Sequence, residues 1–322
     1  MSDGHDARRP FTGLTKPSSQ TQLPPMAPVL ATAAPSLDDV MTRVDNLPTL
    51  STVAIRMGEL VNNPRTGVRE IADVMRQDPA LSAKVLRLVN SSYYAIPGGV
   101  TDVSRAISFV GFNNLYQLVL SASVMTSMKT PTGVEFDARG LWLHSLAVGS
   151  AAEVVAKKVN HPDPSSCFTA GLLHDLGKIA LAIADPNRFG SAIDAARKAG
   201  LGMNVTEREA GLPSHDKVGS HLARRWKFPA MLLAPIECHH HSPEAGARSA
   251  YSASLQSGVD VVALADDLCR SFKLGESGSP HSGKPTTPLL ERLGLSPLHV
   301  DELHTSLMRR LETSKVFLDL VD

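Results

Sequence analysis

Histidine and aspartate residues recur in the second half of the chain, and these are residue types that hold metal ions. Imidazole and carboxylate groups bind zinc, iron or manganese in hydrolytic sites. The chain contains 12 histidines, and several of them cluster between residues 144 and 241. The candidate ligands for one or two divalent metal ions (Fe, Mn or Zn) are His144, His174, Asp175, His215, His239, His240 and Asp266.

The centre of this pattern is the segment GLLHDLGKIAL at residues 171–181, which is typical of a buried helix. A buried carboxylate without a partner is costly, so Asp175 needs an arginine, a backbone N–H or a metal ion beside it. His174 and Asp175 are about 100° apart around a helix axis and can both reach one edge of a cavity. Lys178 follows on the same face, where it could neutralise a phosphate oxygen.

Each candidate ligand also has a purely structural explanation when taken alone. His144 could be a histidine at the edge of the core that bonds to a carbonyl group. Asp266 could pair with Arg270 four residues later. The CHHHSP segment that contains His239 and His240 could be the polar end of a helix, where imidazolium interacts well with the dipole. The order of the whole set is more specific than any of its members.

Helical periodicity in both halves of the chain predicts the elements that position these residues. Apolar residues at 50, 53, 57, 60 and 61 lie three and four apart, on one face of a helix. The segment from Asp78 begins with a capping residue and then Pro79, which suits a first helical turn. No alternating strand pattern of any length occurs, so we predict an all-α protein of two helical subdomains. In a bundle, separate helices can direct such side chains into one interior pocket.

Composition changes along the chain suggest its organisation. We expect a disordered tail over 1–36 that is rich in Pro, Ser and Thr. The remaining expected parts are an N-terminal helical half (37–128), a helical bundle (134–272), a flexible loop rich in Gly, Ser and Pro (273–289) and closing helices (290–322).

The bulk composition narrows the classes of function. Of the 322 residues, 43% are hydrophobic and 20% are charged, as in an ordinary soluble protein. Lys+Arg and Asp+Glu are balanced at 32 each, which argues against a broad nucleic-acid or membrane surface. No apolar run approaches the ~20 residues that span a bilayer. The three cysteines are scattered, so we expect a reduced, cytoplasmic compartment.

Several segments together resemble one known family. The first half contains LPTLSTVAIRMGELVNNP, IADVMRQDPALSAKVLRLVNSSYY and VSRAISFVGFNNLYQLVLS, and the second contains LWLHSLAVGSAAEVVA, AGLLHDLGKIAL, HDKVGSHLARRWKFP and APIECHHHSP. Through these segments, residues 40–270 resemble the HDOD domain. This domain is a bacterial helical signalling module related to the HD and HD-GYP metal-dependent phosphohydrolases.

The resemblance implies a role for each candidate ligand within an HD-type helical bundle. His144 would be the first ligand and Asp266 would close the first site. His174 and Asp175 would be the paired motif, with Asp175 bridging two metals. The remaining ligands would complete the outer site: His215, His239 and His240. The alignment favours His239 and His240 over His241, and Asp266 over Asp267.

Three functions remain open at this point. The resemblance favours a signalling protein that binds a protein partner or a nucleotide, with homo-oligomerisation open. The alternative is a phosphohydrolase for a nucleotide or cyclic dinucleotide, in which Asp175 and Lys178 are catalytic. The absence of Gly-Tyr-Pro after the double histidine, and Gly140 four residues before His144, weaken the case for a cyclic-di-GMP phosphodiesterase. In the third interpretation, the histidines are only buried polar groups of a helical scaffold.

Overall fold

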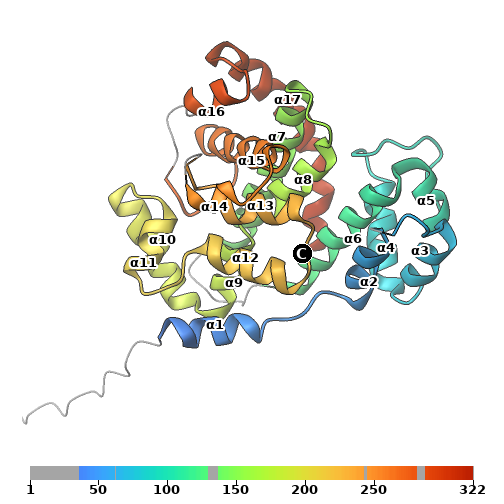
Figure 1. The fold of residues 1–322 in the computed structure, drawn as a ribbon, viewed down its shortest axis with the longest axis horizontal. Coiled ribbons are helices and arrows are strands. Elements are labelled where there is room, and N and C mark those ends of the chain that lie inside the picture. The colour runs from blue at the N-terminus through green and yellow to red at the C-terminus, as the bar shows by residue number, and fades with distance from the viewer. Residues whose placement is uncertain (1–35, 62, 130–136, 243–244, 281–286, 322) are drawn as a thin grey trace, which may run out of the picture. The chain divides into compact units, whose positions relative to one another are not determined.

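The computed structural model describes residues 36–61, 63–129, 137–242, 245–280 and 287–321. These residues form α-helices and two short 3-10 helices, with no strand among them, which confirms the predicted all-α class (Figure 1). The predicted tail at 1–36 lies outside this part of the chain, apart from Ser36. Residues from Pro35 to Asp322 form one compact unit, and the division into two subdomains stays a prediction.

The first group of helices precedes the predicted linker. It comprises α1 (Leu37–Asp45), α2 (Thr52–Val61), α3 (Val68–Met75), α4 (Pro79–Val89), α5 (Val103–Val110) and α6 (Phe112–Ser127). The predicted start of α4 is confirmed, because Asp78 accepts a hydrogen bond from the N–H of Leu81 and Pro79 occupies the first turn. Helix α6 packs against α2, α4 and α5, and it also contacts α8 of the second group.

The second group of helices carries all the candidate ligands. It comprises α7 (Ala138–Lys158), α8 (Pro164–Leu173), α9 (Leu176–Ala184), α10 (Pro186–Ala199), α11 (Met203–Glu209), α12 (His215–Arg225), α13 (Ala230–Cys238), α14 (Gly246–Ser249) and α15 (Ala253–Ser271). The chain closes with α16 (Thr287–Arg292), η1 (Pro297–His299), α17 (Val300–Ser314) and η2 (Lys315–Leu320).

Helix α7 is the centre of this second group, since it packs against α8, α15 and α17. Helix α1 belongs to the first group in sequence, but it packs on α9 and α12 of the second group (Figure 1). The contact between α9 and α12 is close because Gly177 has no side chain. A Cβ atom at Gly177 would lie 1.8 Å from the carbonyl oxygen of His215. The glycine therefore allows the two helices that carry Asp175 and His215 at their starts to approach each other.

In contrast to the expectation from the sequence, one segment of the described residues, Pro164–Ala184, is long and apolar enough to cross a membrane by length and composition alone. It comprises α8 and α9, and 89% of its most apolar window is buried inside the protein. This burial is consistent with core helices of a soluble protein.

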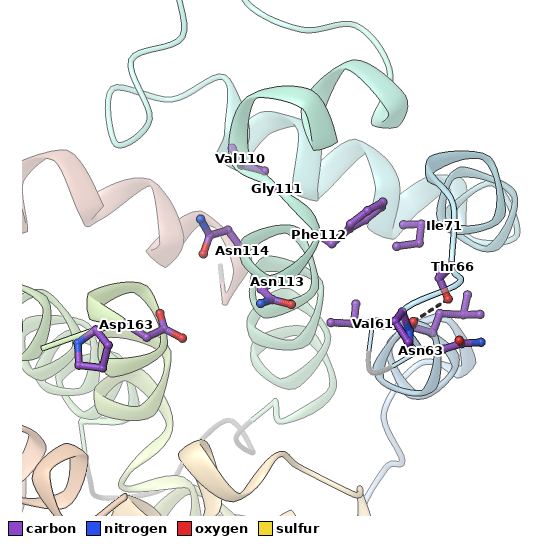
Figure 2. Close-up of a pocket in the computed structure, with 13 residues that line it drawn as sticks. Val61, Asn63, Thr66, Ile71, Val110, Gly111, Phe112, Asn113, Asn114 and Asp163 are labelled. Atoms are coloured by element: carbon purple, nitrogen blue, oxygen red, sulfur yellow. Dashed lines mark hydrogen bonds between the residues drawn. The ribbon is translucent and has the colours of Figure 1, made fainter. Parts of the chain in front are cut away.

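A cavity of about 570 Å³ lies away from the candidate ligands. It is formed where the segment after α2, the junction of α5 and α6, and the segment before α8 meet (Figure 2). Its lining is mixed, with Val61 and Phe112 beside the polar side chains of Asn63, Asn113 and Asp163. None of the seven candidate ligands lines this cavity.

Candidate metal centre

The candidate ligands lie mainly at helix ends, which converge in the interior of the second group. His215 is the first residue of α12, and His239 follows the last residue of α13. His174 and Asp175 lie between α8 and α9, so the segment predicted as one buried helix is divided into two. Asp175 stands at the N-cap position of α9, yet its side chain makes no capping hydrogen bond. Its carboxylate therefore remains available for another partner.

One group of ligand atoms surrounds the Oδ1 atom of Asp175. The Nε2 atoms of His215 and His239 lie 3.5 Å and 3.6 Å from it. The Nε2 atom of His240 lies 2.9 Å from that of His215. One ligand atom from each of these four residues lies within 4.8 Å of the others, as a shared metal ion requires. His240 is the most accessible of the four, and the other three are buried. We call this group the outer half-site.

A second group shares Asp175 and reaches α7 and α15. His144, His174 and Asp175 form a further cluster within 4.8 Å. The Nε2 atom of His174 lies 3.3 Å from Oδ2 of Asp175 and 4.0 Å from Oδ1 of Asp266. The same Asp266 oxygen lies 3.1 Å from Nε2 of His144. We call this group of four residues the inner half-site.

Four of the histidines are held with their Nε2 atoms facing the cluster. Each uses its Nδ1 atom for a contact outside it: His144 with the carbonyl of Leu274 (3.1 Å), His174 with that of Gly171 (2.7 Å), His239 with that of Pro235 (2.9 Å) and His215 with the carboxylate of Glu207 (2.8 Å). A carbonyl or carboxylate partner places a proton on Nδ1, and in a neutral imidazole the lone pair is then on Nε2, which faces the cluster. Metal-ligating histidines are oriented in this way.

Several of these buried atoms have no hydrogen-bond partner. They are Nε2 of His174, Nε2 of His239 and Oδ1 of Asp175. Buried polar atoms are nearly always satisfied, so these three atoms indicate a partner that the neighbouring side chains do not supply. A cation in the cluster would provide that partner. The donor set therefore fits divalent metal ions of the kind that accept imidazole and carboxylate ligands.

The electrostatics of the cluster favour the protonation states that bind metal. Burial raises the pKa of Asp175, but His174 and Lys178 outweigh it and hold that pKa well below its usual range. Burial raises the pKa of Asp266 in the same way, and Arg270 and His144 overcome it. Burial lowers the pKa of His240 well below its usual value, with repulsion from neighbouring histidines in addition. The carboxylates are charged and His240 is neutral at pH 7.

Lys178 and Arg270 form ion pairs with the carboxylates of Asp175 and Asp266. Lys178 is buried, and its Nζ atom donates to Oδ2 of Asp175 at 2.7 Å. The prediction that Lys178 meets a phosphate remains a prediction, since this nitrogen already has a carboxylate partner. The Nε atom of Arg270 lies 3.2 Å from Oδ2 of Asp266, so the predicted ion pair coexists with the contact to His144.

At two positions the sequence offers adjacent residues of the same type as candidate ligands, and in the structure only one residue of each pair lies in the cluster. His240 joins the outer half-site, whereas Nε2 of His241 lies 3.2 Å from Asp216. Asp266 joins the inner half-site, whereas Asp267 lies 3.2 Å from Arg270. The structure thus brings all seven predicted ligands together, and their role as ligands is taken up below.

Glu207 is a functional candidate that the sequence analysis missed. It is fully buried in α11, and it accepts from both Nδ1 and the backbone N–H of His215. Glu207 stands eight residues before His215 in a short polar segment. Its only sequence signal is a glutamate shortly before a candidate histidine, which is common by chance.

Comparison with known proteins places these observations in a family. The model of the HDOD domain matches residues 47–242. An uncharacterised protein of Treponema pallidum (strain Nichols) is 25% identical over 207 residues, which are 64% of this chain. The chain spans only 40% of the length of that relative.

Solved structures show the same fold. An HDOD domain protein of unknown function from Geobacter sulfurreducens is 24% identical, with a TM-score of 0.70 over 87% of this chain and 97% of that one. A candidate phosphohydrolase from Shewanella amazonensis SB2B is 24% identical, with a TM-score of 0.63 over 88% and 98%. A candidate signal-transduction protein from Marinobacter aquaeolei VT8 is 22% identical, with a TM-score of 0.66 over 88% and 65%. Because the family model covers more than half of its residues, the chain belongs to the HDOD domain family.

Proposed function

We propose that this chain is a bacterial, cytoplasmic signal-transduction protein whose HD-type centre binds divalent metal ions. In this proposal, metal loading sets the state of the helical bundle, and the protein acts by binding a protein partner or a nucleotide. One observation carries the metal-binding part. Seven histidine and aspartate side chains from separate helices converge, and three of their buried ligand atoms have no other partner.

The regulatory part is supported by the surroundings of the centre. The shared carboxylate of Asp175 is fully buried, and Lys178 donates a hydrogen bond to one of its oxygens. The cavity of about 570 Å³ lies elsewhere and is not lined by any candidate ligand. A centre this enclosed suits an ion that stabilises one arrangement of helices.

The first experiment measures metal content by plasma mass spectrometry on protein purified without a histidine tag. Asp175→Asn is compared with Asp267→Asn, because Asp267 is a buried aspartate next to the centre that belongs to neither half-site. We expect about two equivalents of Fe, Mn or Zn in the wild type and in Asp267→Asn, and strong depletion in Asp175→Asn. A wild type that stays metal-free after reconstitution with each ion would refute the proposal.

A metal-dependent phosphohydrolase is the second candidate. The arrangement of two ligand groups around one shared aspartate favours it, as does the likeness in fold to a candidate phosphohydrolase. When bound, divalent ions would supply Lewis-acid activation of water and of a phosphoryl group. The residues of this chain would hold the ions, and Lys178 would have to release Asp175 before it could contact substrate.

A single set of samples separates the two candidates. Metal-loaded wild type and Asp175→Asn are incubated with mononucleotides and cyclic dinucleotides, and both binding and product are measured by dialysis and chromatography. Binding without turnover supports the signalling role, and turnover that Asp175→Asn abolishes supports the hydrolase. If metal-loaded protein neither binds nor hydrolyses any of these compounds, the ligand is to be sought among protein partners.

A further inference from the structure

The segment Leu274–Ser279, which we call the strap, follows α15 and lies outside the residues that match the family model. It falls in the part of the chain predicted as a loop rich in Gly, Ser and Pro. In the structure, Ser277 and Ser279 are buried, and the strap contacts α7, α10 and α11.

The strap holds His144 directly. The carbonyl oxygen of Leu274 accepts from Nδ1 of His144 at 3.1 Å. Gly275 has a φ of +71°, and a Cβ atom there would lie 2.2 Å from the backbone nitrogen of His144. The N–H of Glu276 donates to the carbonyl of Gly140 at 2.9 Å, one turn earlier on the same helix. The strap backbone can therefore rest on α7 only because residue 275 is glycine.

The strap also reaches the helix that supports the outer half-site. The hydroxyl of Ser279 accepts from the N–H of Met203, the first residue of α11, at 3.2 Å. The same helix carries Glu207, whose carboxylate fixes the ring of His215. Between these two ends, the carboxylate of Glu276 lies 3.3 Å from Arg197 on α10.

We propose that the strap is a positioning element that joins the two halves of the metal centre. One end sets the ring orientation of His144, and the other end anchors the helix that orients His215. Ring orientation matters because a histidine whose Nδ1 partner is lost can take the wrong tautomer or rotate away from the ion. This inference rests on the metal binding proposed above. It adds to the metal centre a segment that lies outside residues 47–242, which match the family model.

The test compares Gly275→Ala with Gly200→Ala. Gly200 has a similar φ of +66°, but a Cβ atom there meets nothing within 4 Å. Both variants therefore bear the backbone strain of alanine in this conformation, and only Gly275→Ala collides with His144. We expect Gly275→Ala to bind the inner ion about 10–100-fold more weakly, in titrations against a competing chelator. Gly200→Ala should match the wild type.

Hydrogen–deuterium exchange on the wild-type protein gives a second readout that does not depend on a variant folding. Removal of metal with a chelator should speed exchange at the N–H of Glu276, while peptides from α17 should remain unchanged. Ser279→Ala removes the hydrogen bond from the N–H of Met203, and it should lower the metal affinity of the outer half-site more than that of the inner one.

The outcomes distinguish the two proposals. A metal-free wild type overturns the proposed function, and the role of the strap with it. A wild type that binds metal, together with unaltered metal affinity in folded Gly275→Ala and metal-independent exchange in the strap, overturns the strap proposal alone.

Discussion

Replacing Glu207 with glutamine should release the outer metal ion while leaving the fold in place. Oε2 of Glu207 accepts from the backbone N–H of His215 at 2.9 Å, and Nδ1 of His215 lies 2.8 Å from Oε1 and 2.9 Å from Oε2. Glutamine can keep one acceptor oxygen toward the backbone, but its NH₂ group then faces the Nδ1–H. Two donors in contact favour the other tautomer of His215, which carries the proton on Nε2 and cannot bind metal.

The size of the effect follows from the bond that is lost. A hydrogen bond to a charged group contributes about 1.5–3 kcal/mol. This corresponds to a loss in metal affinity of about 10–100-fold, the range found when the outer partner of a ligating histidine is changed. The affinity is measured by titrating metal-free protein with Zn²⁺ or Mn²⁺ in the presence of a competing chelator. The affinity of the outer half-site should fall, while that of the inner half-site should remain as in the wild type.

Glu209→Gln provides the control for this experiment. Glu209 is on the same short helix, two residues later, but its side chain is exposed. The substitution changes the net charge by the same amount without touching a histidine. If Glu207→Gln binds metal as tightly as Glu209→Gln, then the carboxylate does not orient His215 and the reasoning is wrong.

Two further predictions concern stability. The metal-free protein should lose stability as the pH falls below about 6.5, because His240 protonates in the unfolded chain and resists it when folded. The pKa of Asp175 is also held low, so stability should fall further below about pH 4, where Asp175 becomes protonated in the unfolded chain. A melting temperature that rises on acidification in the presence of chelator would contradict both predictions. Arg248→Met should lower the free energy of unfolding, measured by urea denaturation, by about 3 kcal/mol, because the buried Arg248 pairs with buried Asp260 at 2.5 Å. Arg292 pairs with the same Asp260 but is one-third exposed, so Arg292→Met should lower the free energy of unfolding by about 1 kcal/mol or less. Equal losses of unfolding free energy in the two variants would refute this ranking.

The fold class and the candidate ligands could be predicted from the sequence because both depend on local signals. Helical periodicity is a property of neighbouring residues, and the start of α4 at Pro79 follows from the cap at Asp78. The candidate ligands could be selected because histidine is uncommon and the order of the set resembles that of a family. Resemblance also favoured His240 over His241, which periodicity alone could not do.

The supporting residues could not be predicted because their role depends on contacts distant in the sequence. Glu207 lies in a short helix of polar residues, and nothing in that segment shows which side chain is buried. The composition of 273–289 indicates a loop, but it does not show that the backbone at Gly275 meets His144, 131 residues earlier. The break between α8 and α9 was missed for another reason, since the apolar pattern continues through His174 and Asp175 without a helix-breaking residue.

The charges around the centre indicate what a metal-loaded protein would bind. In the metal-free state, Lys178 contacts Asp175 and Arg270 contacts Asp266, so each ligand carboxylate already has a positive partner. Divalent ions added to these paired carboxylates would leave the centre positively charged in a low-dielectric interior. Such a centre favours an anionic ligand, and phosphate groups of a nucleotide have the charge and the oxygen atoms to provide one. If the ligand of the signalling role is a nucleotide, both proposed roles require the same charge on the ligand, and the hydrolase role would in addition require Lys178 to release Asp175 when that ligand binds.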